Sequence, residues 1–360
     1  MNILHVISVP ASGGAEVYVK DLAKYLAQQH NVHVAFLSSA IDAGRSTVYE
    51  KEFLRDLELS GVKTYVIGNE TRKKPWLGAL RVRKYVKKHN IEIMHAHLAY
   101  GIVFSALSKI PVVYTHHTIE QRWNAKIYSV FNVLVDEYVG ISKICAAALS
   151  EYTGKNVNTI SNAVTLDKFE GYVRARSPRE SVNIVMVGRL AAAKDYLNML
   201  KALTLLDESV RQQISVSIAG EGEKEYKDSL VKYIEKHSLG DIVHLVGLIN
   251  NIPEFLYDAD LFVMSSSNEG LPIALTEAVI SGLPCIVTDV GGCSEVVERS
   301  NNGIVIEAQN PQILAEKITE LVVNKSFMHQ MSQNALDSAE DYSINKAAKL
   351  HCDLYNSIIY

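Results

Sequence analysis

The stretch Val182-Asn183-Ile184-Val185-Met186-Val187 decides the predicted fold, because a strand-like pattern begins again here, halfway along the chain. Four of its six residues are Val or Ile, which are enriched in strands. Similar runs follow it, with amphipathic stretches between them, at 214–219, 242–246, 261–265, 284–288 and 303–307. This alternation predicts a parallel sheet that is covered by helices on both faces.

The first half of the chain carries a similar series of runs, at 3–7, 32–37, 62–67, 91–95, 112–115 and 138–141. Because the pattern occurs twice, the sequence predicts two similar α/β domains. We place them at 1–175 and 176–342, since the segment around residue 175 has the weak periodicity and mixed charge of a linker. The helix expected over 343–360 has no strand of its own to cover, and it is a candidate for returning to the first domain.

Composition argues against several classes of protein. The chain has 360 residues and is 48% hydrophobic, which is enough for a sizeable core and favours two domains over one. Its net charge of -4 provides no chain-wide basic field, so we expect no nucleic-acid partner. The cysteines Cys145, Cys285, Cys293 and Cys352 form no CxxC pair, which indicates reduced thiols instead of a zinc site or disulfides.

The expected location is the cytoplasm, with one segment that could reach the inner face of the membrane. No apolar run approaches the ~20 residues that span a bilayer, and the N-terminus shows no signal-peptide pattern. Residues 72–88 hold basic and no acidic side chains, with Trp76 and Leu80 among them, as in helices that lie on anionic membranes. Alternatively, this helix packs Leu80 and Val86 on the sheet and leaves its charges in solvent.

The strongest candidate site follows the run 261–265. Open parallel sheets bind ligands at the carboxyl ends of their strands, and two such sheets facing one another would make a cleft. Here Glu269 precedes a helix in which Pro272 suits the first turn, and Glu277 lies inside that helix. A helix start can seat a diphosphate, with a carboxylate on each side to accept hydrogen bonds from sugar hydroxyls. Alternatively, Glu269 caps the helix and Glu277 is solvated.

Two cations follow the run 182–187. Arg189 and Lys194 could neutralise the negative charge of a bound diphosphate, as a metal ion does in some enzymes. Alternatively, they face solvent at a helix start, although their charge opposes the helix dipole there. Asp258 and Asp260 resemble a metal-binding DxD motif, but they fall where a helix end is expected to lead into a strand.

The first domain offers glycines and histidines at its strand ends. Gly13 and Gly14 follow the run 3–7 and would let the backbone approach a ligand, or they only form a tight turn. They lack the GxGxxG spacing, which disfavours a nicotinamide oxidoreductase. Histidines occur at the ends of two further runs, but the sequence has no nearby carboxylates at a spacing that matches a metal site. A metal site is therefore not favoured. We expect His95 and His116 to be packed or capping residues.

These segments together resemble the retaining glycosyltransferases of family 4, which have the GT-B fold of two Rossmann-like domains facing a central cleft. Glu269-Gly270-Leu271-Pro272 with Glu277 is similar to their E-x7-E motif, and Gly188-Arg189-Leu190 with Lys194 is similar to their G-R-L-x3-K segment. Gly13-Gly14-Ala15-Glu16 resembles their GGAE loop, and Thr115-His116-His117 resembles their Thr-x-His segment. Asp195 stands where the family usually has Gly, which could alter the turn.

The resemblance implies a role for each of these residues. Glu269 would contact the transferred sugar with His117 near the reacting carbon, and Glu277 would bind the ribose. The other expected donor contacts are Gly13, Gly14, Arg189, Lys194, Gly270, Leu271, Pro272 and, beside the nucleotide base, Leu248. Gly291-Gly292 resembles the family's GG-x-x-E stretch, for which no chemical role is predicted.

The function implied is transfer of a hexose or N-acetylhexosamine from a UDP- or GDP-sugar to a glycan or lipid-linked acceptor, in bacterial surface-polysaccharide biosynthesis. The resemblance implies no metal and no cofactor, since the nucleotide sugar is a substrate. Two alternatives remain open. One keeps the donor but uses a small soluble acceptor, and the other is a non-catalytic module that binds sugar nucleotides.

Overall fold

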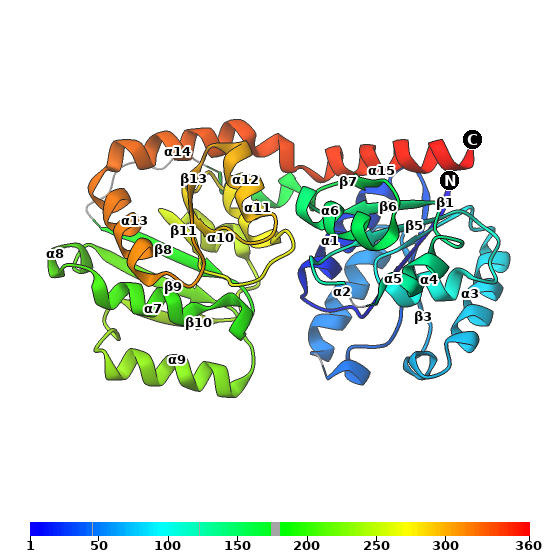
Figure 1. Ribbon diagram of the computed structural model, residues 1–360, viewed down its shortest axis with the longest axis horizontal. Coiled ribbons are helices and arrows are strands. Elements are labelled where there is room, and N and C mark those ends of the chain that lie inside the picture. The colour runs from blue at the N-terminus through cyan, green and yellow to red at the C-terminus, as the bar shows by residue number, and fades with distance from the viewer. Residues whose placement is uncertain (45, 122, 174–180) are drawn as a thin grey trace. The chain divides into compact units, whose positions relative to one another are not determined.

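The computed structural model describes residues 1–44, 46–121, 123–173 and 181–360 (Figure 1). The chain divides into two compact units. Unit 1 comprises Met1–Val164 and Ile344–Tyr360, and unit 2 comprises Thr165–Ser343. The predicted boundary between residues 175 and 176 lies outside the described residues.

Within the described chain, unit 1 is built on a seven-stranded parallel sheet with the strand order β3-β2-β1-β4-β5-β6-β7. Its strands are β1 (Asn2–Ile7), β2 (Asn31–Phe36), β3 (Lys63–Val66), β4 (Ile93–Ala96), β5 (Val112–His116), β6 (Glu137–Gly140) and β7 (Val157–Thr159). Its helices are α1 (Gly14–Leu26), α2 (Thr47–Leu59), α3 (Pro75–His89), α4 (Ala99–Ser105), α5 (Ala125–Phe131), α6 (Lys143–Thr153) and α15 (Ile344–Ile359).

Among its described residues, unit 2 holds a six-stranded parallel sheet with the order β10-β9-β8-β11-β12-β13. Its strands are β8 (Val182–Val187), β9 (Ile214–Ala219), β10 (Val243–Gly247), β11 (Leu261–Met264), β12 (Cys285–Thr288) and β13 (Gly303–Ile306). Its helices are α7 (Tyr196–Leu205), α8 (Glu208–Arg211), α9 (Lys224–Lys236), α10 (Ile252–Tyr257), α11 (Ile273–Ile280), α12 (Cys293–Ser300), α13 (Pro311–Val323) and α14 (Lys325–Ser338).

The predicted α/β architecture is confirmed in both units, and Figure 1 shows helices on the two faces of each sheet. The strands at the centre are buried throughout, which explains why they are nearly continuous apolar runs. In unit 1, Leu4 and Val6 pack under α3, α4 and α5, whereas the alternate residue His5 faces the opposite side of the sheet. The strand β7, a half-buried edge strand of three residues, was not predicted from the sequence.

The last helix, α15, belongs to unit 1 and packs beside α1 (red in Figure 1). Its buried residues recur at helical spacing, and two of them are polar. His351 Nε2 lies 2.9 Å from the hydroxyl of Tyr18, and the hydroxyl of Tyr355 lies 2.6 Å from His95 Nδ1. The helix therefore adds polar side chains to the interior of the first unit.

Strand order reverses at one place in each sheet. In unit 1 the first strand β1 lies between β2 and β4, and in unit 2 the first strand β8 lies between β9 and β11. At such a switch point the loops that leave the carboxyl ends of the two neighbouring strands diverge and leave a crevice for a ligand. The loops after β1, β8 and β11 carry most of the predicted site residues, whereas His117 follows β5 and Leu248 follows β10.

Candidate active site

The loops after β8 and β11 bring together two of the predicted residues, Lys194 and Glu269. The ammonium Nζ of Lys194 lies 2.5 Å from Glu269 Oε1, and the hydroxyl of Ser266 donates to the same oxygen at 2.7 Å. Both side chains are largely buried, with 23% of Lys194 and 10% of Glu269 exposed. Glu269 therefore does not cap α11, and its carboxylate is the counterion of Lys194.

Hydrogen bonds between the two loops hold this pair in place. The Ser265 hydroxyl donates to the carbonyl oxygen of Asp195 at 2.9 Å, and the Ser267 N–H donates to that of Ala193 at 2.8 Å. Asp195 has the left-handed φ of 43°, and its side chain accepts the N–H of Asn198 at the start of α7. Asp195 therefore forms a left-handed turn, a conformation that Asp tolerates better than most residues.

Gly291 and Gly292 lie against the backbone of the Glu269 loop. The N–H of Gly292 donates to the carbonyl oxygen of Gly270 at 2.6 Å. Gly291 has φ of +57°, and a Cβ there would overlap the carbonyl oxygen of Glu269 and lie 2.7 Å from that of Gly270. Only glycine fits this close approach in a left-handed conformation. This pair, for which no chemical role was predicted, supports the loop that carries Glu269.

The other predicted residues of unit 2 lie near these loops or further along the sheet. Arg189 is exposed after β8, and its guanidinium has no ion-pair partner among the described residues. Leu248 is exposed after β10, two strands from β8. Gly270 and the buried Leu271 lead into α11, in which Glu277 is half-buried.

The predicted position of Pro272 in the first turn of α11 is wrong by one residue. The helix begins at Ile273, and Pro272 precedes it with an extended backbone, ψ of 126°. Its carbonyl oxygen accepts the first helical hydrogen bonds, from the N–H groups of Leu275 and Thr276. The free N–H groups at the start of α11 therefore still follow Glu269 closely.

Asp258 and Asp260 lie at the opposite edge of the same sheet. Asp260 Oδ2 accepts the backbone N–H of Asn183 at 2.9 Å, and the carbonyl oxygen of Asp258 accepts from the Asn183 side chain at 3.0 Å. Asn183 lies at the amino end of β8, whereas Lys194 follows its carboxyl end. These aspartates therefore support the start of the strand, away from Lys194 and Glu269.

In unit 1, the predicted glycines open the 13-residue helix α1. Gly13 is the residue before the helix, Gly14 is its first residue, and both are exposed. Glu16, in the first turn, accepts a hydrogen bond from the Ser8 hydroxyl at 2.5 Å. The arrangement offers backbone N–H groups at the carboxyl end of β1.

The predicted residue His117 belongs to a buried histidine cluster, which we define as His5, His95, His97, His117 and His351. His97 Nδ1 lies 3.0 Å from His117 Nε2, and His97 Nε2 lies 3.0 Å from His5 Nδ1. As expected, His95 is a packed residue, between the hydroxyls of Thr115 and Tyr355. His116 is buried as well and contacts the hydroxyl of Tyr114.

Burial makes the cluster electrically neutral. It lowers the pKa of His5, His117 and His351 to about 3. For His95 and His97, burial and then the neighbouring imidazoles lower the pKa well below 6.5. An imidazole removed from water loses its hydration as a cation, so the neutral form prevails at physiological pH.

His5 and His351 were not predicted from the sequence as members of the cluster. The signal for His5 was a polar residue inside an otherwise apolar buried strand. His5, His95 and His97 also have ring nitrogens within 4.8 Å of one another, close enough to share a metal ion. Five of these six nitrogens already have a partner within the described residues, and only His5 Nε2 does not.

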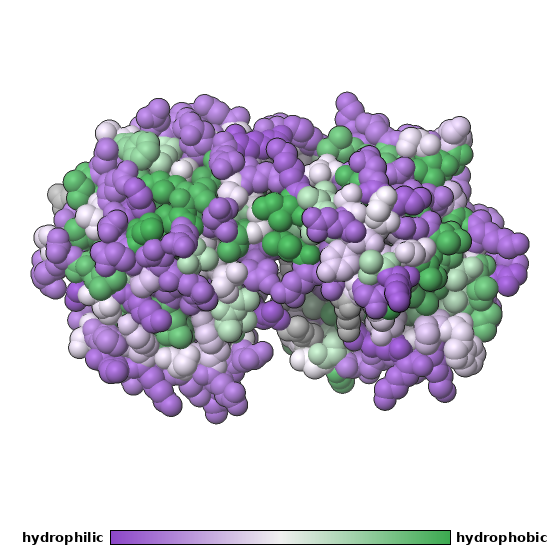
Figure 2. Space-filling model, viewed as in Figure 1, coloured by the Kyte–Doolittle hydropathy of each residue, from purple (hydrophilic) through white to green (hydrophobic). Residues whose placement is uncertain are grey.

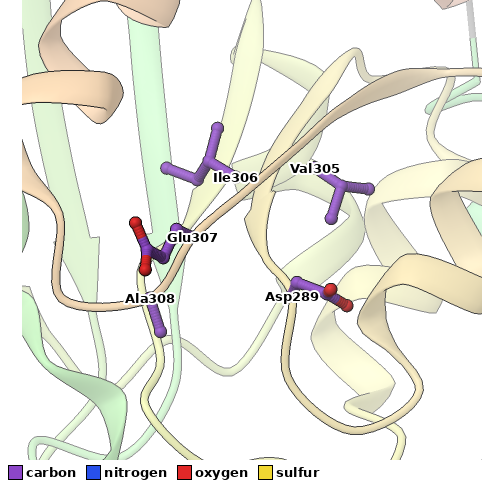
Figure 3. Close-up of a pocket in the computed structure, with 5 residues that line it drawn as sticks. All are labelled: Asp289, Val305, Ile306, Glu307 and Ala308. Carbon is purple, nitrogen blue, oxygen red and sulfur yellow. The ribbon is translucent and has the colours of Figure 1, made fainter.

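A shallow pocket lies at the carboxyl ends of β12 and β13 (Figure 3). It is lined by Asp289, Val305, Ile306, Glu307 and Ala308. None of the predicted site residues is among them, and both of its charged side chains are acidic. An acidic lining is a poor match for a diphosphate.

Comparison with known proteins covers nearly the whole chain. Residues 173–337 match the family model described as "Glycosyl transferases group 1", and residues 12–168 match "Glycosyltransferase Family 4". The O-antigen biosynthesis glycosyltransferase WbnH of Escherichia coli is 25% identical over 85% of this chain and 86% of its own. A second E. coli relative, named UDP-Gal:alpha-D-GlcNAc-diphosphoundecaprenol alpha-1,3-galactosyltransferase, is 27% identical over 77% of this chain and 78% of its own.

Solved structures share the fold. The structure of Alr3699/HepE from Anabaena in complex with UDP-glucose has a TM-score of 0.81 to this chain, with 19% identity. The alignment covers 99% of this chain and 100% of that one.

Proposed function

The chain belongs to the family 4 glycosyltransferases of the GT-B fold, of the type that builds bacterial surface polysaccharides, and from this we propose a specific reaction. In this reaction the protein transfers a hexose or N-acetylhexosamine from a UDP-sugar to a lipid-linked glycan and retains the anomeric configuration of the sugar. The observation that carries the proposal is the largely buried pair of Lys194 and Glu269 at the switch point of unit 2.

The charges at this point fit the departure of a nucleoside diphosphate. As the bond to the sugar breaks, negative charge grows on the diphosphate, and Lys194, Arg189 and the N-terminus of α11 stabilise it. Lys194 has three N–H donors, so it can keep Glu269 as a partner while it binds a phosphate oxygen. Ionised Glu269 accepts hydrogen bonds from sugar hydroxyls, and Glu277, deeper in α11, accepts from the ribose.

The choice of UDP over GDP is supported by the relatives. The E. coli galactosyltransferase is named for UDP-Gal, and the Anabaena structure holds UDP-glucose. Thermal unfolding of the full chain with UDP, GDP and their common sugars tests this choice. UDP compounds at about 100 times their dissociation constant should add roughly 2.7 kcal/mol to the free energy of unfolding. Stabilisation by GDP compounds alone would assign the donor to GDP, and no stabilisation by any of them would overturn the proposal.

We further propose that the reaction needs no metal, because Lys194 and Arg189 supply the positive charge. Turnover with UDP-sugar and acceptor should therefore persist in excess EDTA. The measurement is product formation before and after addition of EDTA and then Mg²⁺ or Mn²⁺. Full loss of activity that a metal restores would contradict this, and the imidazoles of His5, His95 and His97 would then be examined as ligands.

Gly291→Ala should impair catalysis more than folding. A Cβ at Gly291 would push the carbonyl of Glu269, and a misplacement of about 1 Å in a catalytic group can cost on the order of a hundredfold in rate. We expect turnover to fall at least tenfold, with a loss of about 1 to 3 kcal/mol in unfolding free energy. Gly240→Ala is the control, since a Cβ there meets no atom within 4 Å. Equal turnover in both variants would contradict the supporting role of Gly291.

A lipid-linked acceptor is supported by one face of α3. Trp76 and Leu80 are 62% and 47% exposed, and Arg83, Lys84 and Lys87 continue the same face at helical spacing. An adjoining face of the helix packs Ala79, Val82 and Val86 into unit 1. Hydrophobic and hydrophilic surfaces adjoin on the side of unit 1 that carries α3 (Figure 2). None of the described helices is long and apolar enough to cross a membrane.

Vesicle binding distinguishes this acceptor from a small soluble one. Full-length protein should sediment with vesicles of anionic phosphatidylglycerol and much less with neutral phosphatidylcholine. Each Lys or Arg near an anionic surface contributes about 1 kcal/mol, so Lys84→Ala with Lys87→Ala should lower the partition coefficient roughly thirtyfold. The same loss of charge on α9, Lys227→Ala with Lys232→Ala, is the control. Weak binding to both vesicle types would favour a soluble acceptor.

A further inference from the structure

Three imidazoles from adjacent strands form a chain of hydrogen bonds that leads to His117. His5 lies in β1, His97 follows β4 and His117 follows β5. Two contacts of 3.0 Å join them, from His5 Nδ1 to His97 Nε2 and from His97 Nδ1 to His117 Nε2. The chain thus runs from the interior of unit 1 to its predicted catalytic histidine.

Neutral imidazoles make the chain directional. Each ring carries one N–H donor and one acceptor nitrogen, and His97 uses both nitrogens. His97 must therefore donate to one neighbour and accept from the other. Only two orders of protons are possible, and one is the reverse of the other.

The two ends of the chain decide between these orders. Among the described residues, neither His5 Nε2 nor His117 Nδ1 has a hydrogen-bond partner. Either order places an N–H at one end and a lone pair at the other. Both of these nitrogens are buried, but His5 as a whole is 0% exposed, whereas the His117 side chain is partly exposed at the carboxyl end of its strand. An unpaired N–H costs more than an unpaired lone pair, and only the N–H at the His117 end can gain a partner when a ligand binds, so the N–H belongs at His117.

We propose that His5 and His97 are positioning residues that hold His117 as its Nδ1–H tautomer. His5 Nδ1–H donates to His97, and His97 Nδ1–H donates to His117 Nε2. His117 then presents a single N–H, at Nδ1, to an oxygen of the bound substrate. It acts as a hydrogen-bond donor and not as a general base. This inference rests on the proposed function for the identity of the substrate, but the tautomer belongs to the protein alone.

The tautomer can be observed directly in the full-length chain. Nitrogen-15 NMR of protein labelled in its histidine rings separates protonated from unprotonated ring nitrogens, and His117→Gln identifies the His117 signals by their loss. We expect a protonated Nδ1 and an unprotonated Nε2 in the wild type without substrate. The reverse assignment would overturn the proposal. Because no turnover is involved, this result stands or falls separately from the transferase activity.

Substitutions at His97 test whether the chain sets the tautomer. His97→Leu removes the donor to His117, so the preference for the Nδ1–H tautomer should disappear. Turnover should also fall about tenfold, which corresponds to the free energy of one neutral hydrogen bond. The donor in this assay is UDP-glucose or the UDP-sugar selected in the thermal screen. His97→Asn places an amide N–H near the former Nδ1, and it should restore both the tautomer and most of the turnover. His244→Asn, on exposed β10, controls for the loss of a histidine. Loss of turnover in His97→Leu with an unchanged tautomer would reduce His97 to a packing role.

Discussion

Replacing Lys194 by alanine is expected to lower turnover by about 10² to 10³, the typical effect of removing one group that stabilises developing negative charge. The Lys194 ammonium is largely buried and already fixed against Glu269, so it is preorganised for the diphosphate. Ser266 still donates to Glu269 after the substitution, and the fold should survive. Steady-state kinetics gives the change in turnover number, and thermal unfolding checks that the variant is folded.

Two further variants test whether the loss of turnover is specific to positive charge at the proposed site. Arg189→Ala should also lower turnover, but less than Lys194→Ala, because Arg189 is exposed and its charge is screened by water. Lys232→Ala, on the exposed side of α9, removes the same charge from the same unit and should have no effect. Unchanged turnover in both Lys194→Ala and Arg189→Ala would show that the diphosphate binds elsewhere.

The positions of most strands could be predicted because buried parallel strands consist of short, nearly continuous runs of apolar and often β-branched residues. Both series of runs became strands to within one or two residues, from β1 to β13. The exception is β7, whose three residues Val157–Thr159 are half-buried at an edge. An edge strand with one neighbour needs little apolar surface, so its composition resembles that of a loop.

The partners of the site residues could not be predicted, because they depend on strand order. Lys194 and Glu269 are separated by 75 residues and meet only because β8 and β11 are neighbours in the sheet. His5 and His97 are separated by 92 residues, and His95 and Tyr355 by 260. Local patterns identify a strand and its end, but long-range contacts between loops follow from tertiary packing.

Acid should unfold unit 1 before unit 2, because the buried histidine cluster lies wholly in unit 1. Burial lowers the pKa of His5, His117 and His351 to about 3, and that of His95 and His97 also falls well below the usual 6.5 of histidine. A depressed folded-state pKa means that unfolding takes up protons below pH 6.5. The stabilisation is complete above that pH and is lost as the pH falls from 6.5 towards the folded-state values.

The size of this effect follows from proton uptake. Relative to its value well above pH 6.5, the free energy of unfolding at pH 5.5 is lower by about 1.4 kcal/mol for each imidazole that stays neutral in the fold. For five such imidazoles the decrease is on the order of 5 to 7 kcal/mol. Whole domains are stable by only about 5 to 15 kcal/mol. Unit 1 should therefore lose roughly 5 kcal/mol between pH 6.5 and 5.5, a third or more of the stability of a typical domain, where ordinary carboxylates are still ionised.

Denaturant unfolding followed by tryptophan fluorescence measures this loss in unit 1, because both tryptophans of the chain, Trp76 and Trp123, lie there. His351→Gln should keep a partner for the Tyr18 hydroxyl but cannot titrate. This variant should reduce the slope of the unfolding free energy against pH by up to about 1.4 kcal/mol per pH unit. The control is His244→Gln, at an exposed site in unit 2, which should leave the slope unchanged. A flat profile from pH 7 to 5.5, or the same slope in wild type and His351→Gln, would mean that the cluster accepts protons while unit 1 remains folded.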